Sequence, residues 1–147
     1  MSNDTLGAYN IFDLREMAQK RTPRGVFEFV DRGTEDEVAL RNNREAFERI
    51  KLKPRTLVDV SKRNQDIEFF GHTHKMPIGI APTGTAGLLW YQGEIALAKA
   101  AAAAGIPFTL ATGSQTAMEK VAEAVPGARL WFQLYMWPDR SLSHQLV

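Results

Sequence analysis

The feature that most constrains the fold is a short apolar run followed by a helical segment, repeated three times from Met76 onward. The apolar runs cover residues 76–81, 106–111 and 130–136, and the helical segments cover residues 93–104, residues 116–125 and a stretch that begins after Asp139. Strands that alternate with helices through short connections predict a parallel sheet covered by helices. Apolar strands without polar alternation are typical of strands buried on both faces.

The number of strands is small for such a sheet. Three parallel strands would leave two long apolar edges unpaired, which natural proteins avoid. An eight-strand barrel needs about 250 residues, a doubly wound sheet needs roughly two or three more strands, and the chain has 147 residues. The sequence therefore predicts that residues 76–147 form the first three strands of a larger α/β domain. These strands are expected to be incomplete alone, and a C-terminal complement is expected to complete the sheet.

Residues 1–75 precede the repeat, and their first part predicts three short helices that form a cap. Asn10 is the predicted N-cap of a helix through residue 20. Pro23 is placed to start a second helix that ends at Gly33. The apolar spacing predicts a third helix over about residues 35–50.

A hairpin is expected after this cap, with strands at residues 67–70 and 77–81 around a turn at Gly71. His72 and His74 flank that turn at a spacing of two. Two such histidines on one strand face could bind a metal ion, but a structural metal site needs a closed ligand set and no third ligand lies near. A polar hairpin turn is therefore the favoured interpretation.

Composition excludes several classes of protein. Lysine and arginine number 18 against 17 aspartate and glutamate, and a net charge of +1 is too small to attract nucleic acid or an anionic membrane. The chain has no cysteine, which excludes disulfides and cysteine nucleophiles. A signal-peptide pattern and a run of 18 apolar residues are both missing. The expectation is a cytoplasmic protein with no transmembrane segment, no nucleic-acid partner and no metal.

Ligand sites of parallel α/β folds form at the carboxyl ends of the strands. The first end, residues 81–87, consists of small residues that let the backbone approach a planar ligand, and such residues equally serve a tight strand–helix turn. It is not a phosphate loop, because no Gly-Lys-Ser/Thr follows. At the second end, Ser114 is favoured as an N-cap over a nucleophile, because no base lies near it in sequence.

The third end is the most informative. Strand alternation places Trp131, Gln133 and Tyr135 on one face. An unpaired glutamine in an apolar strand costs about 1–3 kcal/mol. Its carboxamide is both donor and acceptor, which suits the pyrimidine edge of a flavin, and the alternative is a glutamine paired with neighbouring backbone. The ligand interpretation is favoured because Tyr135 joins Gln133 at the strand end.

Motifs along nearly the whole chain carry a family resemblance. They are Gly33-Thr-Glu-Asp-Glu37, Asn43-Arg-Glu-Ala-Phe47, Lys53-Pro-Arg55, Leu57-Val-Asp-Val60, Met76-Pro77, Ala81-Pro-Thr83, Gly93-Glu94, Ala103-Ala-Gly-Ile-Pro107 and Trp131-Phe-Gln-Leu-Tyr135. With them the chain resembles the FMN-dependent 2-hydroxy-acid dehydrogenase and oxidase family, which includes glycolate oxidase, lactate oxidase, lactate dehydrogenase and mandelate dehydrogenase. The stretch over residues 84–97 is most similar to the mandelate dehydrogenase branch.

The resemblance implies the N-terminal part of a (β/α)₈ TIM barrel that uses FMN to oxidise a 2-hydroxy acid to a 2-oxo acid. It implies that Pro82, Thr83 and Gly84 lie against the flavin ring system and that Gln133 holds the pyrimidine edge. Tyr135 would point its phenol toward the substrate and steady charge in the transition state. It also implies a homo-oligomer, commonly a tetramer.

Two positions depart from the family pattern. Phe29 stands where the family usually has a substrate-binding tyrosine, so a substrate carboxylate loses one donor. The expected consequence is either weaker binding of small hydroxy acids or a preference for a bulkier apolar substrate. Ala111 stands where a flavin-contacting serine is frequent, which leaves only its backbone to contribute.

The family's catalytic histidine, flavin-contacting lysine and substrate-binding arginines belong to later strands, and His144 does not match that histidine. Residues 1–147 alone are therefore expected to be inactive. The alternative is a catalytically inactive half-barrel or flavin-binding module, which Phe29 and Ala111 mildly favour. Another FMN barrel chemistry, such as an isomerase, would share the first loop but not the strand at residues 131–135.

Overall fold

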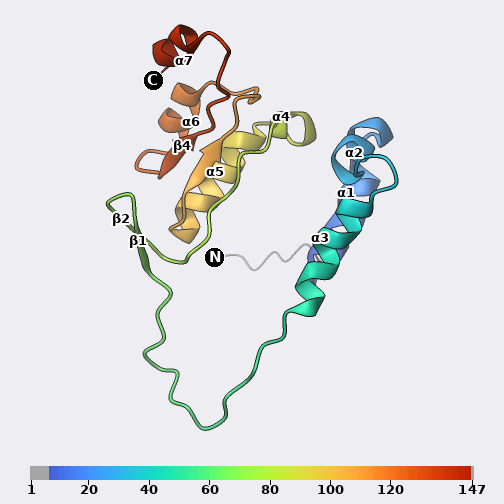
Figure 1. Ribbon diagram of the computed structural model, residues 1–147, viewed down its shortest axis with the longest axis vertical. Helices are drawn as coiled ribbons and strands as arrows, with labels where there is room; N and C mark the ends of the chain where they lie inside the picture. Colours follow the sequence, from blue (N-terminus) through green and yellow to red (C-terminus); the bar gives the residue numbers. More distant parts are fainter. Residues whose placement is uncertain (1–6, 147) are drawn as a thin grey trace. The chain divides into compact units, whose positions relative to one another are not determined.

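The computed structural model describes residues 7–146 of the chain. Contacts within the chain divide it into two units, one up to Asp59 and one from Val60 onward, and each is described by itself (Figure 1). The sequence predicts a different boundary, at residue 75, between the N-terminal cap with its hairpin and the first strands of the barrel. That division concerns the assembled domain and stays a prediction.

The first unit contains three helices, as the sequence predicts: α1 (Ile11–Arg21), α2 (Arg24–Asp31) and α3 (Val38–Arg49). Asn10 caps α1, because its side chain accepts hydrogen bonds from the backbone N–H groups of Phe12 and Asp13 at 2.7 and 3.1 Å. The Asp13 carboxylate in turn accepts the Asn10 N–H, which completes a capping box. The third helix begins at residue 38 rather than 35, since Glu35 and Glu37 adopt φ angles of 51° and 59° outside the helical region.

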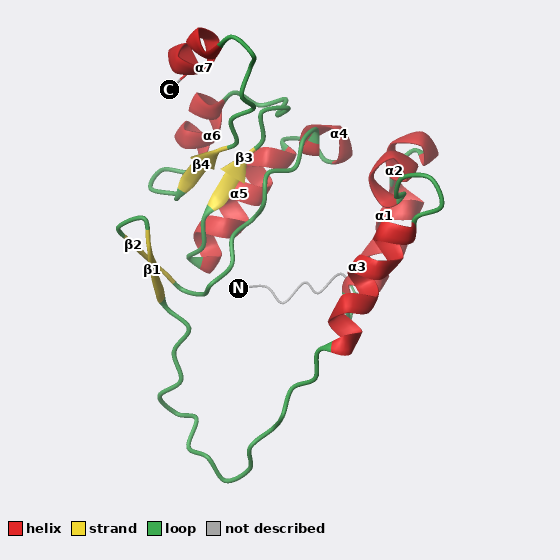
Figure 2. Ribbon diagram, viewed as in Figure 1, coloured by secondary structure: helices red, strands yellow, loops and turns green. Residues whose placement is uncertain are grey.

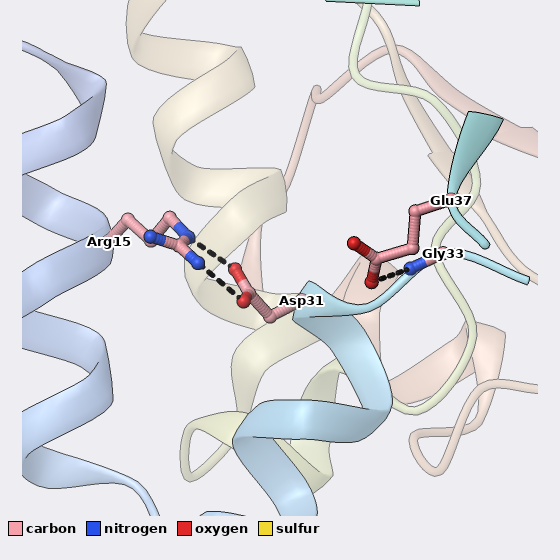
Figure 3. A network of polar contacts seen from close by, with 4 residues as sticks. All are labelled: Arg15, Asp31, Gly33 and Glu37. Atoms are coloured by element: carbon pink, nitrogen blue, oxygen red, sulfur yellow. Dashed lines mark hydrogen bonds and ion pairs between the residues drawn. The ribbon is translucent and has the colours of Figure 1, made fainter. Parts of the chain in front are cut away.

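An ion pair joins α1 to α2 (Figure 3). The Arg15 guanidinium donates to both carboxylate oxygens of Asp31, at 2.5 Å from Nε and 2.7 Å from Nη2. This hydrogen-bonded pair lowers the pKa of the Asp31 carboxyl group below its ordinary value. After α2, the Glu37 carboxylate accepts the N–H of Gly33 at 3.1 Å and fixes the turn toward α3.

The second unit begins with an antiparallel hairpin of β1 (Ile67–Phe69) and β2 (His72–His74). The turn is at Gly71, as predicted, but the prediction of residues 77–81 as its second strand is wrong. Phe70 and Gly71 both have positive φ angles, 49° and 72°, so they form a two-residue turn that pairs the chain immediately. β2 therefore follows the turn directly.

The polar interpretation of the hairpin holds for the exposed His72 and is wrong for His74. His74 is 2% exposed, and its ring lies edge-on to Trp131 with centroids 6.3 Å apart. Within residues 7–146 no cluster of three or more metal-ligating side chains exists.

The predicted parallel strands follow (Figure 2). β3 (Phe108–Leu110) pairs with β4 (Leu130–Phe132) in parallel register, with Phe108 opposite Leu130. The first predicted strand is reduced to a parallel bridge between Ile80 and Phe108, in which the Thr109 N–H donates to the Ile80 carbonyl at 3.0 Å. Three chain segments therefore run side by side in parallel.

Four helices accompany these strands: α4 (Ala86–Leu89), α5 (Gly93–Ala104), α6 (Met118–Ala124) and α7 (Arg140–Leu146). The predicted span of α5 is confirmed at both ends, and Gly105 stops it with a φ of 68°. Asp139 accepts the Ser141 N–H at 2.9 Å at the start of α7, as expected of a cap. The one-turn helix α4 was not predicted.

The core of this unit lies between α5, α6 and the strands. Its buried members are Ile95, Ala98, Ala101, Ile106, Phe108, Leu110, Val121 and Val125. Alanines on α5 let the helix backbone approach β3 closely, and the larger side chains of β3 fill the space beneath. This packing holds the carboxyl ends of the strands and the loops that follow them.

Candidate functional site

The carboxyl ends of the three parallel segments meet, and hydrogen bonds connect the loops that follow them. The Thr85 N–H donates to the Gly113 carbonyl at 3.1 Å, which joins the first loop to the second. The Thr112 N–H donates to Gln133 Oε1 at 3.2 Å, and the Thr112 hydroxyl donates to the Gln133 carbonyl. The structure therefore brings the first, second and third predicted strand ends into one site.

The first two loops form a floor of small residues. A Cβ atom added at Gly84 would lie 3.9 Å from the Gly113 oxygen, and one added at Gly113 would lie 3.9 Å from the Gly84 Cα. Pro82 is half-buried, and Thr83 and Gly84 are exposed. The Thr83 hydroxyl makes only a long hydrogen bond, 3.4 Å, to the Ala81 carbonyl. The backbone of Thr83 and Gly84 and the hydroxyl of Thr83 are therefore open to a ligand.

Gln133 follows β4 and is half-buried. Its amide oxygen is paired with the neighbouring Thr112 backbone, as the alternative interpretation expected. Its amide nitrogen has no hydrogen-bond partner among the described residues. One half of the carboxamide is thus held in place and the other half is left as a donor.

The other three predicted site residues, Tyr135, Ala111 and Phe29, lie in different parts of the chain and differ in exposure. Tyr135 is 61% exposed beyond the end of β4. Ala111 is buried, and its carbonyl accepts the Ser114 N–H at 3.0 Å, so its backbone already stabilises the second loop. Phe29 lies on α2 in the first unit and is 70% exposed, and its role at the substrate stays a prediction.

The prediction of Ser114 as the N-cap of the next helix is wrong, because that position is occupied by Ala117. The Ser114 hydroxyl accepts the Thr116 N–H at 3.0 Å and donates to the Thr116 carbonyl at 2.8 Å. Its hydrogen bonds are made within the loop, four residues before α6 begins at Met118.

Glu94 was not predicted as a site residue, yet it lies at the centre of these loops. It is in the first turn of α5 and only 1% exposed. Burial acts to raise the pKa of its carboxyl group. Hydrogen bonds from its own N–H, from the Thr116 hydroxyl and from the N–H groups of Gln115 and Gly87 outweigh that effect and leave the pKa below its ordinary value. The available signal was an acidic residue in the first turn of an alanine-rich helix.

Parallel strands, helices between them and a site at the strand ends define the class: the N-terminal part of a (β/α)₈ barrel, incomplete alone. The family model for FMN-dependent dehydrogenases matches residues 18–147. The chain belongs to the FMN-dependent dehydrogenase family, whose cofactor is FMN.

Known proteins agree with this assignment. The chain is 44% identical over 128 residues to (S)-mandelate dehydrogenase of Pseudomonas putida, covering 87% of this chain and 32% of that protein. It is 40% identical over 138 residues to glycolate oxidase 3 of Oryza sativa subsp. indica, covering 94% and 37%. The chain therefore spans about a third of the length of these curated relatives.

Solved structures show the same relationship. Mandelate oxidase with (S)-4-hydroxymandelic acid matches at a TM-score of 0.86 and 35% identity, covering 95% of this chain and 39% of that one. The monotopic membrane protein (S)-mandelate dehydrogenase matches at a TM-score of 0.85 and 40% identity, covering 95% and 38%. No helix within residues 7–146 has the length and apolar character to cross a bilayer. The cytoplasmic location stays a prediction.

Proposed function

We propose that the protein containing this chain oxidises a 2-hydroxy acid to a 2-oxo acid with FMN held at the strand ends. The observation that carries the proposal is the unpaired amide nitrogen of Gln133 beside the floor formed by Gly84 and Gly113. A floor of small residues, joined by the Gln133–Thr112 hydrogen bond to one free amide donor, fits a planar heterocycle that carries carbonyl oxygens.

The chain's own residues divide the binding of FMN between them. Pro82, Thr83 and Gly84 offer backbone and a hydroxyl to the ring system, and Ala111 contributes through its backbone. The Gln133 amide nitrogen donates to the pyrimidine edge, while the Thr112 N–H fixes the orientation of the carboxamide. FMN, when bound, supplies the two-electron acceptor for the substrate α-carbon.

Tyr135 and Phe29 act on the substrate in this proposal. The exposed phenol of Tyr135 donates to the substrate carboxylate or hydroxyl oxygen and stabilises negative charge that develops there. Phe29 offers an aromatic ring without a hydroxyl, which favours a mandelate-like substrate over a small one. A histidine outside residues 1–147 removes the hydroxyl proton, so these residues alone are expected to be inactive. The protein is expected to be a homo-oligomer.

Tyr135→Phe in the intact, FMN-loaded protein tests this assignment, with Tyr91→Phe as the matched control because Tyr91 is 83% exposed and lies outside the site. Loss of a donor to developing charge should lower kcat for the 2-hydroxy acid by about 10²-fold, and the control should keep the wild-type rate. Equal rates for both variants would remove Tyr135 from the mechanism. A flavin-loaded protein that oxidises no 2-hydroxy acid would instead support an inactive flavin-binding module.

A further inference from the structure

We propose that Glu94 is a positioning residue that braces the two flavin-facing loops, residues 83–87 and 111–116, against each other. The inference rests on the proposed function for the role of the loops. It goes beyond that function because Glu94 itself is assigned no contact with flavin or substrate.

The brace is a single carboxylate shared by both loops. Glu94 Oε1 accepts the Gly87 N–H of the first loop at 3.2 Å and the Gln115 N–H of the second at 3.3 Å. Glu94 Oε2 accepts the Thr116 hydroxyl of the second loop at 2.9 Å. A shift of either loop therefore removes a donor from the same buried group.

The charge of Glu94 makes these bonds depend on one another. Among the described residues, no lysine, arginine or histidine pairs with Glu94, although its side chain is 1% exposed. A buried carboxylate without a counter-ion is tolerated only when its oxygens are hydrogen-bonded. The donors come from the start of α5 and from both loops, so the carboxylate is stabilised only when both loops are in place.

The packing around the carboxylate leaves little room for another arrangement. A Cβ added at Gly87 would lie 3.2 Å from Glu94 Oε2 and 2.8 Å from the Gln115 amide oxygen. A Cβ added at Gly93 would lie 2.5 Å from the Ala86 carbonyl oxygen. The Thr85–Gly113 hydrogen bond lies in the same two loops. Glu94 thus sets the spacing of the floor on which Thr83, Gly84 and Ala111 act.

Glu94→Gln in the intact protein tests the brace, with Glu119→Gln as the matched control because Glu119 is exposed in the first turn of α6. The first readout is hydrogen exchange of the Gly87 and Gln115 amides without added FMN. The second is the FMN dissociation constant, measured by quenching of flavin fluorescence. We expect exchange at both amides to be about tenfold faster and FMN binding about tenfold weaker in Glu94→Gln, with neither changed in the control.

A second pair of variants covers the case in which Glu94→Gln fails to fold. Thr116→Val removes the donor to Glu94 Oε2 and Thr116→Ser retains it. Thr116→Val should reproduce the faster exchange and weaker FMN binding, and Thr116→Ser should restore wild-type behaviour.

The outcomes separate the brace from the proposed function. Exchange and FMN affinity within twofold of the control would overturn the brace, as would equal acceleration of the β3 amides, which would mean general destabilisation. Faster exchange at Gly87 and Gln115 in a protein whose wild type binds no FMN would support the brace between the loops and reject the flavin function. Faster exchange with unchanged FMN affinity would overturn the positioning role.

Discussion

Gly93 is the position where the structure predicts the clearest cost for one added methyl group. It is buried at the first turn of α5, against the one-turn helix α4. A Cβ there would lie 2.5 Å from the Ala86 carbonyl oxygen and 2.7 Å from its carbon, whereas real Cβ atoms stay at least 3.0 Å from such atoms. The Ala86 oxygen would have to move by about 0.5 Å, and backbone atoms cannot rotate away as a side chain can.

The expected cost of Gly93→Ala is about 1–2 kcal/mol of unfolding free energy. Overpacking against a fixed neighbour costs about 1–3 kcal/mol, and the higher helix propensity of alanine offsets part of it. Gly25→Ala is the matched control, since Gly25 lies in helix α2 with no atom within 4 Å of an added Cβ. That substitution should stabilise by about 0.4–1 kcal/mol.

Urea unfolding of the intact protein, followed by circular dichroism, measures both changes. The two variants should shift the unfolding midpoint in opposite directions at unchanged m-value. Because α4 carries Gly87, Gly93→Ala should also weaken FMN binding, whereas Gly25→Ala should not. A Gly93→Ala protein as stable as wild type would show that α4 moves freely and that the contact between Gly93 and Ala86 does not limit the packing.

Three further predictions concern the core, a helix end and the ion pair. Val121→Ala, at a fully buried position of α6, should lower the free energy of unfolding by about 2 kcal/mol in urea, and a loss below about 0.5 kcal/mol would contradict the packing described. Gly105→Val should lower the melting temperature more than Gly105→Asn, because asparagine tolerates the φ of 68° better, and equal shifts would refute this. The pKa of Asp31 is lowered by Arg15, so the pair contributes stability above the unfolded pKa of about 3.9 that is lost as pH falls through the lowered value. Asp31→Asn should therefore flatten the acid limb of a stability–pH curve, and identical limbs in variant and wild type would exclude this contribution.

Elements with local causes were predictable from the sequence. The Asn10 cap depends on residues within one turn of it, and Gly105 ends α5 through its own backbone conformation. The second hairpin strand was missed because residues 72–74 are polar, whereas the apolar run after Pro77 suggested a strand. The actual turn requires a positive φ at Phe70, a bulky residue for which sequence patterns give no such signal.

The polar residues at the strand ends were predictable from the sequence, but the buried residue that holds their loops together was not. Gln133 is conspicuous because an amide inside an apolar strand needs an explanation, and the structure shows half of that amide paired. Glu94 resembles an ordinary acidic residue in a first helical turn. Its burial depends on Gly87 and Gln115, which are brought to it only by the packing of separate loops. The roles of Tyr135 and Phe29 stay predictions.

The most direct measurement for the proposed function is anaerobic mixing of the intact, FMN-loaded protein with glycolate, lactate and mandelate, followed by visible absorbance. We predict that at least one of these acids bleaches the oxidised flavin bands and yields one 2-oxo acid per flavin reduced, with mandelate the fastest because Phe29 favours an apolar substrate. A protein that cannot be loaded with FMN, or whose flavin stays oxidised with all three acids, would contradict the proposed FMN-dependent oxidation of a 2-hydroxy acid.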